Sequence, residues 1–438
     1  MSEVRASEAN SAAPPTAGHW HSASHHRRLK RRYAADRRLR MLGLGAIGLA
    51  IGLLGILIVS LVYTGYVAFT QTRVELEFRI DPALVKPEDV RSGNFRSIVR
   101  QAIFEQFPEV TNRRQQTQLA RLLSPGAEWI VRDYVVAHPE VIGQTIKLMV
   151  PVADPYDQLN KGILSRDVPE SQRRLDDEAI GWFDTLKQRG LIHTTIAWEL
   201  FVNADSRFPE MAGLAGAIAG SFLTLLVCFL LSFPLGIAAA VYLEEFAPKN
   251  RLTSLIEVNI NNLAAVPSIV FGLLGLAVFL GFFGLPRSSP LVGGMVLSLM
   301  TLPTIIIATR ATLKSVPPSI REAALGIGAS QHQVILHHVL PLAMPGILTG
   351  TIIGLAQALG ETAPLLLIGM NAFIPSVESI GFFEPATALP TQIYSWADSP
   401  ERGFVARTSA AILVLLGFLI VMNAVAIYLR QKFERKWS

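Results

Sequence analysis

The sequence predicts an all-α polytopic membrane protein of six transmembrane helices, with a mixed α/β domain inserted after the first of them. Hydrophobic residues make up 50% of the 438 residues and charged residues only 17%, whereas soluble domains carry about a quarter charged residues. The mean hydropathy is +0.38. Six apolar segments are long enough to cross a bilayer, and the stretch between the first two is rich in charge. These observations together define the fold class.

The first apolar segment, residues 41–66, follows a basic region that predicts its orientation. Asp36 is the only acid among eight cations there, which are Arg27, Arg28, Lys30, Arg31, Arg32, Arg37, Arg38 and Arg40. Such a cluster can contact nucleic acid, but beside a span it is typical of the cytoplasmic end. A cleavable signal peptide has a shorter apolar core and a small-residue cleavage site, so we expect an uncleaved anchor. Residues 1–40 are expected to be a disordered, basic, cytoplasmic N-terminus.

Residues 71–209 differ in character and predict a folded extracytoplasmic (periplasmic) domain, because one span separates them from the basic terminus. The alternation from Val74 to Phe78 predicts a strand. A second strand is expected at 143–152, and helices at 87–107, 111–137 and 169–189. His138 and His193 are isolated, and this region has no cysteine and no nucleophile elbow. We therefore predict neither catalytic residues nor a metal site here.

Five further apolar segments follow, and they predict a membrane core at residues 211–430. The segments are 211–243, 260–283, 291–308, 342–367 and 406–429. An even number of spans returns the C-terminus, residues 431–438, to the cytoplasm. The basic residues agree with this topology, since they gather after the last span and in the loops expected to be cytoplasmic: Lys249, Arg251, Lys314, Arg321, Arg430, Lys432, Arg435 and Lys436.

Two absences in the sequence limit the chemistry of the chain. Its only cysteine, Cys228, lies in an apolar run, so an intramolecular disulfide and a cysteine metal site are excluded. No segment has the pattern G-x-x-x-x-G-K-[ST] that holds nucleotide phosphates. The chain is therefore not expected to be an enzyme, and if ATP drives its function a partner ATPase must bind the ATP and Mg²⁺.

The loop between the fourth and fifth spans, residues 314–341, has the features of a docking element. Ile320, Ala323, Ala324 and Ile327 are expected on one side of a short helix, where small alanines allow a partner to come close. Gly328 allows a turn that a side chain would obstruct. Proline at the start of the next span suits a first helical turn. A helical hairpin without a partner is the alternative.

This loop resembles the EAA motif of ABC-importer permeases, which have a MetI-like fold. The pattern is E-A-A, a glycine six residues after the glutamate, and a later I-x-L-P. The matching residues, with the arginine that precedes them, are Arg321, Glu322, Ala323, Ala324, Gly328, Leu340 and Pro341. His338 stands where the family has isoleucine. The resemblance implies that the short helix docks in a cleft of the ATPase and transmits its closure.

Three further segments are similar to phosphate permeases of the PstA type. They are Ala264–Leu273, Gly360–Leu365 and Leu389–Tyr394. The resemblance covers about residues 213–437. It implies import of inorganic phosphate across the bacterial inner membrane, with both termini cytoplasmic. It also implies a second permease (PstC-type), an ATPase dimer (PstB-type) and a periplasmic phosphate-binding protein (PstS-type). The N-terminal extension occurs in only some members, and the resemblance assigns it no function.

Four residues are candidates for the translocation pathway: Arg310, Gln357, Glu361 and Thr362. Glu361 is expected inside the fifth span, where a charge is functional by default. It binds an arginine of a partner, or accepts a proton from hydrogen phosphate, which sulfate lacks, or is a protonated structural group hydrogen-bonded between helices. Arg310 matches a pathway arginine of the family and suits an oxyanion, or it extends to the membrane surface. Gln357 replaces a frequent arginine and Leu313 a frequent acid, so the partner permease is expected to supply charge.

Two other functions remain open from the sequence. One is a permease of the same architecture for another oxyanion, such as sulfate or molybdate. The other is a phosphate-sensing scaffold, in which the domain at 71–209 detects a ligand and the spans transmit the signal. The segments Ala264–Leu273 and Gly360–Leu365, which resemble phosphate permeases, argue against the first. The EAA loop argues that transport is retained in the second.

Overall fold

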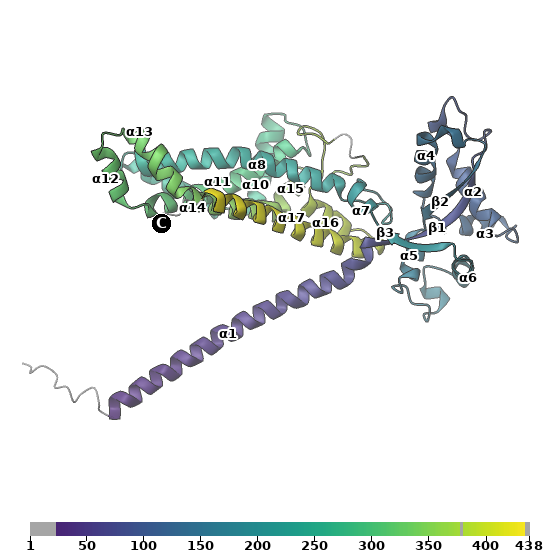
Figure 1. Ribbon diagram of the computed structural model, residues 1–438, viewed down its shortest axis with the longest axis horizontal. Coiled ribbons are helices and arrows are strands. Elements are labelled where there is room, and N and C mark those ends of the chain that lie inside the picture. The colour runs from purple at the N-terminus through teal and green to yellow at the C-terminus, as the bar shows by residue number, and fades with distance from the viewer. Residues whose placement is uncertain (1–22, 377–379, 434–438) are drawn as a thin grey trace, which may run out of the picture. The chain divides into compact units, whose positions relative to one another are not determined.

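The computed structural model describes residues 23–376 and 380–433, in two units that divide after Ser60. The first unit holds most of helix α1 (Ala23–Gly65) (Figure 1). The predicted disorder of residues 1–40 is wrong from Ala23 onward. The basic segment is rich in Arg, Lys, Leu and Ala, which are good helix formers, and it continues the apolar helix without a break. Residues 1–22 lie outside the described residues.

The second unit begins with a small three-stranded antiparallel sheet, ordered β2-β1-β3. Its strands are β1 (Thr70–Arg79), β2 (Thr145–Pro151) and β3 (Ile192–Ile196). Val74, Leu76 and Phe78 on β1 are almost fully buried because alternate side chains of a strand face the same side. They pack with helices α2 (Phe95–Glu105), α4 (Ala127–Ala137) and α6 (Asp177–Gln188) in one hydrophobic core. This region is therefore a folded body with its own interior.

The two predicted strands are confirmed, but the third strand and the exact helices were not predicted. The helix expected at 87–107 begins only at Phe95, where the Asn94 side chain accepts a hydrogen bond from the Ser97 N–H. The helix expected at 111–137 is two helices, α3 (Arg113–Ala120) and α4, because Pro125 and Gly126 interrupt it. The helix at 169–189 shortens to α6, capped by Asp176. The remaining elements are η2 (Tyr66–Phe69), η3 (Val90–Ser92), η4 (Pro139–Val141), α5 (Asp154–Asn160), η5 (Glu170–Gln172) and α7 (Glu199–Val202).

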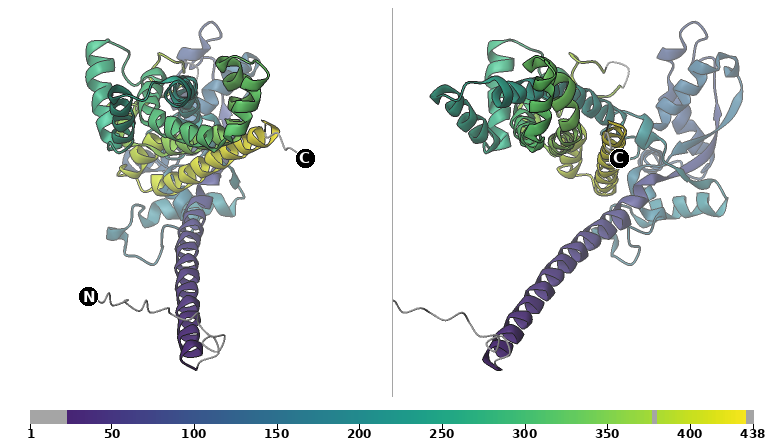
Figure 2. Two further views of the ribbon diagram at one scale, coloured as in Figure 1. Left: turned by 90° about the vertical axis from the view of Figure 1, so that its left-hand side faces the viewer. Right: turned by 60° about the vertical axis from the view of Figure 1, so that its left-hand side comes forward.

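The membrane core consists of long apolar helices. In the described residues five helices are long and apolar enough to cross a membrane, or six if one bent pair counts as a span. The core elements are α8 (Ala215–Val241), η6 (Tyr242–Phe246), α9 (Arg251–Ala264), α10 (Ser268–Leu274), η7 (Gly275–Phe282), α11 (Pro290–Ser315), α12 (Pro318–Gly326), α13 (Gln331–Gln333), η8 (Val334–Val339), α14 (Leu340–Gly360), α15 (Ala363–Leu367), α16 (Leu389–Ala397) and α17 (Gly403–Phe433). Helix α11 packs against both α8 and α14, and α17 packs along α14 (Figure 2).

Two of the predicted spans are interrupted. The third breaks before Ser268, and its two halves, α9 and α10–η7, meet at 104°. Pro267 causes this, since proline removes a helical hydrogen bond and restrains the residue before it. The fifth ends at Gly360, and α15 is a separate short helix. Glu361 therefore lies at a helix break and not well inside a continuous span.

Asn259 on α9 forms its side-chain hydrogen bond within its own helix. Its side-chain amide donates to the Leu255 carbonyl of its own helix at 2.8 Å. The whole of α9 carries no buried residue, so few partners from other helices reach it. The C-terminal cations Arg435 and Lys436 lie outside the described residues, whereas residues 431–433 continue α17 as helix.

Candidate functional site

The docking loop is held to the membrane core through Arg321. One nitrogen of its guanidinium donates to the Val316 carbonyl at 2.7 Å, and the other donates to the Leu313 carbonyl at 2.9 Å. These carbonyls belong to the C-terminal end of α11, where helical partners are lacking. The second nitrogen also lies 2.7 Å from the Glu245 carboxylate on η6. Arg321 therefore ties α12 to both α11 and the end of α8, at one end of the helical bundle (Figure 1).

The predicted partner-facing side of α12 is corrected by the burial of its residues. Ile320 and Ala324, one helical turn apart, pack into a hydrophobic cluster with Leu313. Ala324 is therefore unavailable to a partner. Ala323 is exposed, and Ile327 is 83% exposed. The surface open to a partner is formed by Glu322, Ala323, Leu325 and Ile327, which are all exposed.

Gly328 ends this surface in a backbone conformation that requires glycine. Its φ is +88°, a region that L side chains rarely adopt. Its N–H donates to the Leu325 carbonyl at 2.9 Å, and the next N–H, of Ala329, donates to Ala324 at 3.1 Å. Space is open where a Cβ would stand, so the requirement is conformational. The chain then enters α13 through Ser330. Leu340 and Pro341 open α14 as expected.

Arg310, the candidate pathway arginine, is held by two carboxylates. Its Nε lies 3.2 Å from Glu244, and one terminal nitrogen lies 2.7 Å from Glu257. Its side chain is only 17% exposed, so it does not simply extend into water. The group faces an open cavity of about 750 Å³ at the ends of α8, α9 and α11. Sequence reasoning missed both glutamates, although acids at the ends of two neighbouring spans were a visible signal.

Glu361, Gln357 and Thr362 gather where α14 ends. Glu361 is the half-buried residue after the last helical turn, with an extended ψ of 120°. Among the described residues, no hydrogen bond or ion pair holds its carboxylate. Gln357 is exposed one turn earlier, and Thr362 precedes α15. The carboxylate is thus free to meet a ligand or another chain.

The structure does not bring Arg310 and Glu361 together. Gly350 of α14 lies against Ala308 of α11, and Gly354 lies near Thr301 and Thr304. The two helices are therefore antiparallel, and Arg310 is level with about residue 348. Glu361 lies roughly 20 Å further along the helix axis at 1.5 Å per residue. The four pathway candidates thus mark two levels of the core.

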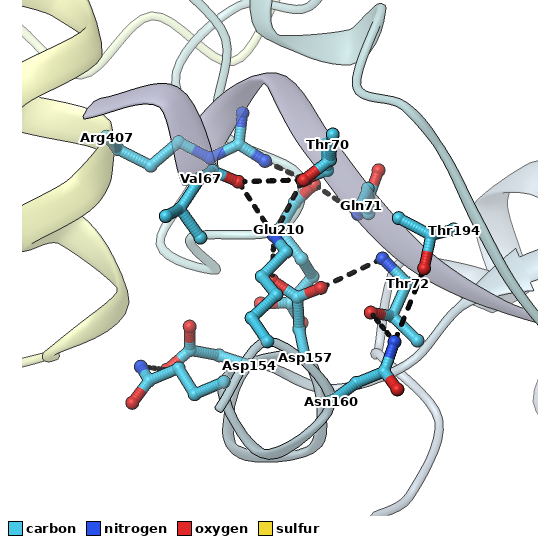
Figure 3. A network of polar contacts seen from close by, with 12 residues as sticks. Val67, Thr70, Gln71, Thr72, Asp154, Asp157, Asn160, Thr194, Glu210 and Arg407 are labelled. Atoms are coloured by element: carbon cyan, nitrogen blue, oxygen red, sulfur yellow. Dashed lines mark hydrogen bonds and ion pairs between the residues drawn. The ribbon is translucent and has the colours of Figure 1, made fainter. Parts of the chain in front are cut away.

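A second buried arginine, Arg407, lies where α17 meets the sheet domain (Figure 3). It is 5% exposed, and among the described residues its side chain donates only to the Glu210 backbone carbonyl, at 3.4 Å. One of its terminal nitrogens has no partner in the part of the chain that the structure describes. Sequence reasoning missed Arg407, although it lies inside the predicted sixth span, where the rule applied to Glu361 holds equally.

The cavity beside Arg407 has a volume of about 370 Å³ and is lined by both acids and bases. Lys161 donates to the Val67 and Thr70 carbonyls at 2.9 and 2.6 Å and to Asp157 at 2.6 Å. Burial lowers the pKa of Lys161. Burial also raises the pKa of the Glu210 carboxyl to about 7. This cluster joins the start of α17 to β1 and α5 through polar contacts.

Comparison with known proteins defines the class. Residues 232–438 match the family model "Binding-protein-dependent transport system inner membrane component", and residues 26–170 match "Domain of unknown function (DUF3333)". The phosphate transport system permease protein PstA of Xylella fastidiosa (strain 9a5c) is 32% identical over 254 residues, which cover 58% of this chain and 86% of the relative. PstA 1 of Mycobacterium tuberculosis (strain H37Rv) is 32% identical over 51% of this chain and 71% of the relative.

A probable ABC transporter permease protein, YqgI of Bacillus subtilis (strain 168), is 27% identical over 59% of this chain and 90% of the relative. A solved chain of the MetNI methionine ABC transporter matches 51% of this chain and 95% of its own length, at 18% identity and a TM-score of 0.39. The PstA relatives and the family model show that the protein is a multi-pass membrane permease subunit of an ABC importer and not an enzyme. It belongs to the PstA family of phosphate transport system permease proteins, with an additional N-terminal region.

Proposed function

We propose that this chain is the permease subunit of an ATP-driven importer of inorganic phosphate in the bacterial inner membrane. One observation carries the proposal, namely 32% identity to PstA proteins across 86% of their length. The docking loop supports it, because its exposed surface and its glycine turn suit an ATPase partner. An ATPase dimer of the PstB type would bind ATP and Mg²⁺. A PstC-type permease would complete the pathway, and a PstS-type protein would deliver phosphate.

The topology we propose has both termini in the cytoplasm. Residues 1–40 and 431–438 are then cytoplasmic, 41–66 is the first span, and 71–209 is the extracytoplasmic domain. Residues 211–430 form the permease core with its cytoplasmic docking loop at 314–341. The basic residues before the first span and in this loop support the orientation. The separate hydrophobic core of the sheet region supports an independent domain.

Docking is assigned to Arg321, Glu322, Ala323, Gly328, Leu340 and Pro341, with Ala324 supporting the helix from inside. ATPase closure would move α12 against the ends of α11 and α8, since Arg321 binds both. Movement of packed helices is a common way to switch a membrane pathway between its two openings.

Phosphate recognition is assigned to Arg310, Gln357, Glu361 and Thr362. A guanidinium suits an oxyanion through paired hydrogen bonds. The unpaired Glu361 carboxylate would accept a hydrogen bond from the P–OH group that hydrogen phosphate carries and sulfate lacks, and would repel a fully ionised anion. Arg310 and Glu361 lie at different depths of the membrane core, which is consistent with a path on which the anion binds first near one of them and then near the other.

The decisive experiment is uptake of labelled phosphate by the complete complex, with sulfate and molybdate as competitors. We expect that unlabelled phosphate reduces the uptake of labelled phosphate and that sulfate and molybdate do not. We expect Glu361→Gln to reduce both phosphate uptake and the discrimination against sulfate, while the complex still assembles. Preferential uptake of sulfate or molybdate would contradict the proposal. Unchanged uptake by Glu361→Gln would make that carboxylate structural.

A further inference from the structure

The π-helical segment η6 at the end of α8 carries two neighbouring glutamates that point to different partners. Glu244 pairs with Arg310 at 3.2 Å and with Lys314 at 3.5 Å, both on α11. Glu245 pairs with Arg321 on α12 at 2.7 Å. One short segment therefore connects the candidate pathway arginine to the docking helix.

The docking loop contacts η6 at two further points. The Gln331 side chain donates to the Glu245 backbone carbonyl at 3.0 Å. The rings of Phe246 and His332 lie 4.9 Å apart. Since α12 and α13 both contact η6, a movement of the loop must displace η6 or break these contacts. π-helical turns interrupt the regular helical register and are frequent at functional sites.

The guanidinium of Arg310 is already paired with the carboxylates of Glu244 and Glu257. Glu244 and Glu257 are 18% and 35% exposed in their side chains, so water screens these pairs less than surface pairs. An oxyanion needs the same guanidinium N–H groups that now face the two carboxylates. Binding of the anion at Arg310 and pairing with Glu244 and Glu257 are therefore in competition.

We propose that η6 is the lever between ATPase docking and substrate release, with Glu244, Glu245 and Glu257 as its positioning residues. Glu245 transmits the displacement of α12 to η6, and Glu244 together with Glu257 sets how readily Arg310 holds the anion. When η6 moves toward Arg310, Glu244 joins Glu257 of α9 on the guanidinium and the anion is displaced; when η6 moves away, Glu244 leaves and a guanidinium N–H is free to bind the anion. The inference rests on the proposed function, since it concerns the same arginine and the same docking loop.

The test uses the full chain assembled with its ATPase, partner permease and binding protein in lipid vesicles. In Glu245→Gln we expect ATP hydrolysis per complex to persist, while phosphate transported per ATP falls about fivefold or more, the size of a typical coupling between sites. In Glu244→Gln with Glu257→Gln we expect both the KM for phosphate and the maximal rate to fall, because Arg310 holds the anion longer. Glu109→Gln, at an exposed position of the sheet domain, is the matched control.

The outcomes separate this inference from the function it rests on. If the wild-type complex does not transport phosphate, the proposed function fails. If the wild type transports and the glutamine variants keep its KM and its ratio of phosphate to ATP, the lever is wrong. If the variants only reduce the amount of assembled complex, with unchanged kinetics per complex, the glutamates are structural and the inference is overturned.

Discussion

Two arginines of the membrane core, the partly buried Arg310 and the buried Arg407, differ in how their charge is matched. Arg310 pairs with two carboxylates from neighbouring spans, whereas Arg407 reaches only a backbone carbonyl at 3.4 Å. They also lie far apart. Arg430 of α17 donates to Thr349 of α14 at 3.4 Å, level with Arg310, and Arg407 precedes Arg430 by roughly 35 Å of helix at 1.5 Å per residue.

This difference separates Arg310, whose carboxylate partners an anion could replace, from Arg407, which has no such partner among the described residues. Arg310 faces an open cavity, where we propose that an anion replaces its carboxylates. Arg407 is 5% exposed, between α17 and the sheet domain, with Glu210 and Asp157 lining the same cavity. Its positive charge favours the ionised forms of these acids, although burial still raises the pKa of Glu210. We therefore read Arg310 as a functional group and Arg407 as an anchor.

The largest expected effect tests the anchor. Arg407→Met keeps the volume but removes the charged hydrogen bond to the Glu210 carbonyl, so we expect a loss of about 1.5–3 kcal/mol in the free energy of unfolding. Denaturant titration of the purified protein in detergent measures this. The exposed Arg402, which lines the same cavity, is the control, and Arg402→Met should change the value by less than about 0.5 kcal/mol. Equal effects of the two substitutions would remove the distinction.

The second prediction concerns the pH dependence of the same cluster. Folding raises the pKa of Glu210 from 4.5 to about 7 through burial. A raised pKa stabilises the folded state fully below pH 4.5, and this contribution of about 3 kcal/mol is lost as pH rises through 7. The denaturant concentration at the midpoint of unfolding should therefore decrease as the pH rises from 5 to 8. In Glu210→Gln this dependence should flatten, and an unchanged dependence would show that other groups cause it.

The third prediction tests Arg310 as a functional group. Arg310→Met should reduce phosphate uptake about 10- to 100-fold, the loss expected for about 1.5–3 kcal/mol of hydrogen bonding to a charged ligand, with less effect on unfolding than Arg407→Met. Transport assays and unfolding curves on the same preparations compare the two. Lys249→Met, at an exposed position beside the same cavity, should leave uptake near wild type. Normal uptake by Arg310→Met would make Arg310 a second anchor.

The smallest effect is expected at the docking loop, next to the functional arginine. Gly328→Val forces a β-branched residue to φ +88°, a strain of about 1–2 kcal/mol. It should lower phosphate transported per ATP while the protein still inserts. Asn tolerates this backbone region better, so Gly328→Asn should be milder. If the two variants behave alike, the turn conformation is not what couples the loop.

The sequence predicted the features that depend on local pattern. The apolar segments gave the membrane helices because a span needs only length and apolar composition. The strand at 74–78 followed from alternation, a second strand was expected at 143–152, and the turn at Gly328 was expected from its place after a short helix. The EAA loop and the PstA-like segments led to the family that the relatives confirm.

Only the tertiary structure decided which charges meet. Glu244 and Glu257 approach Arg310 from the ends of α8 and α9, and Arg407 meets Glu210 across nearly two hundred residues of chain. Such pairs have no spacing in the sequence, because the packing of separate helices creates them. The burial of Ala324 and the break after Gly360 were likewise decided by neighbouring helices. The sequence by itself thus determined the spans, the family and the docking loop, while helix packing decided which buried arginine has partners that an anion can displace.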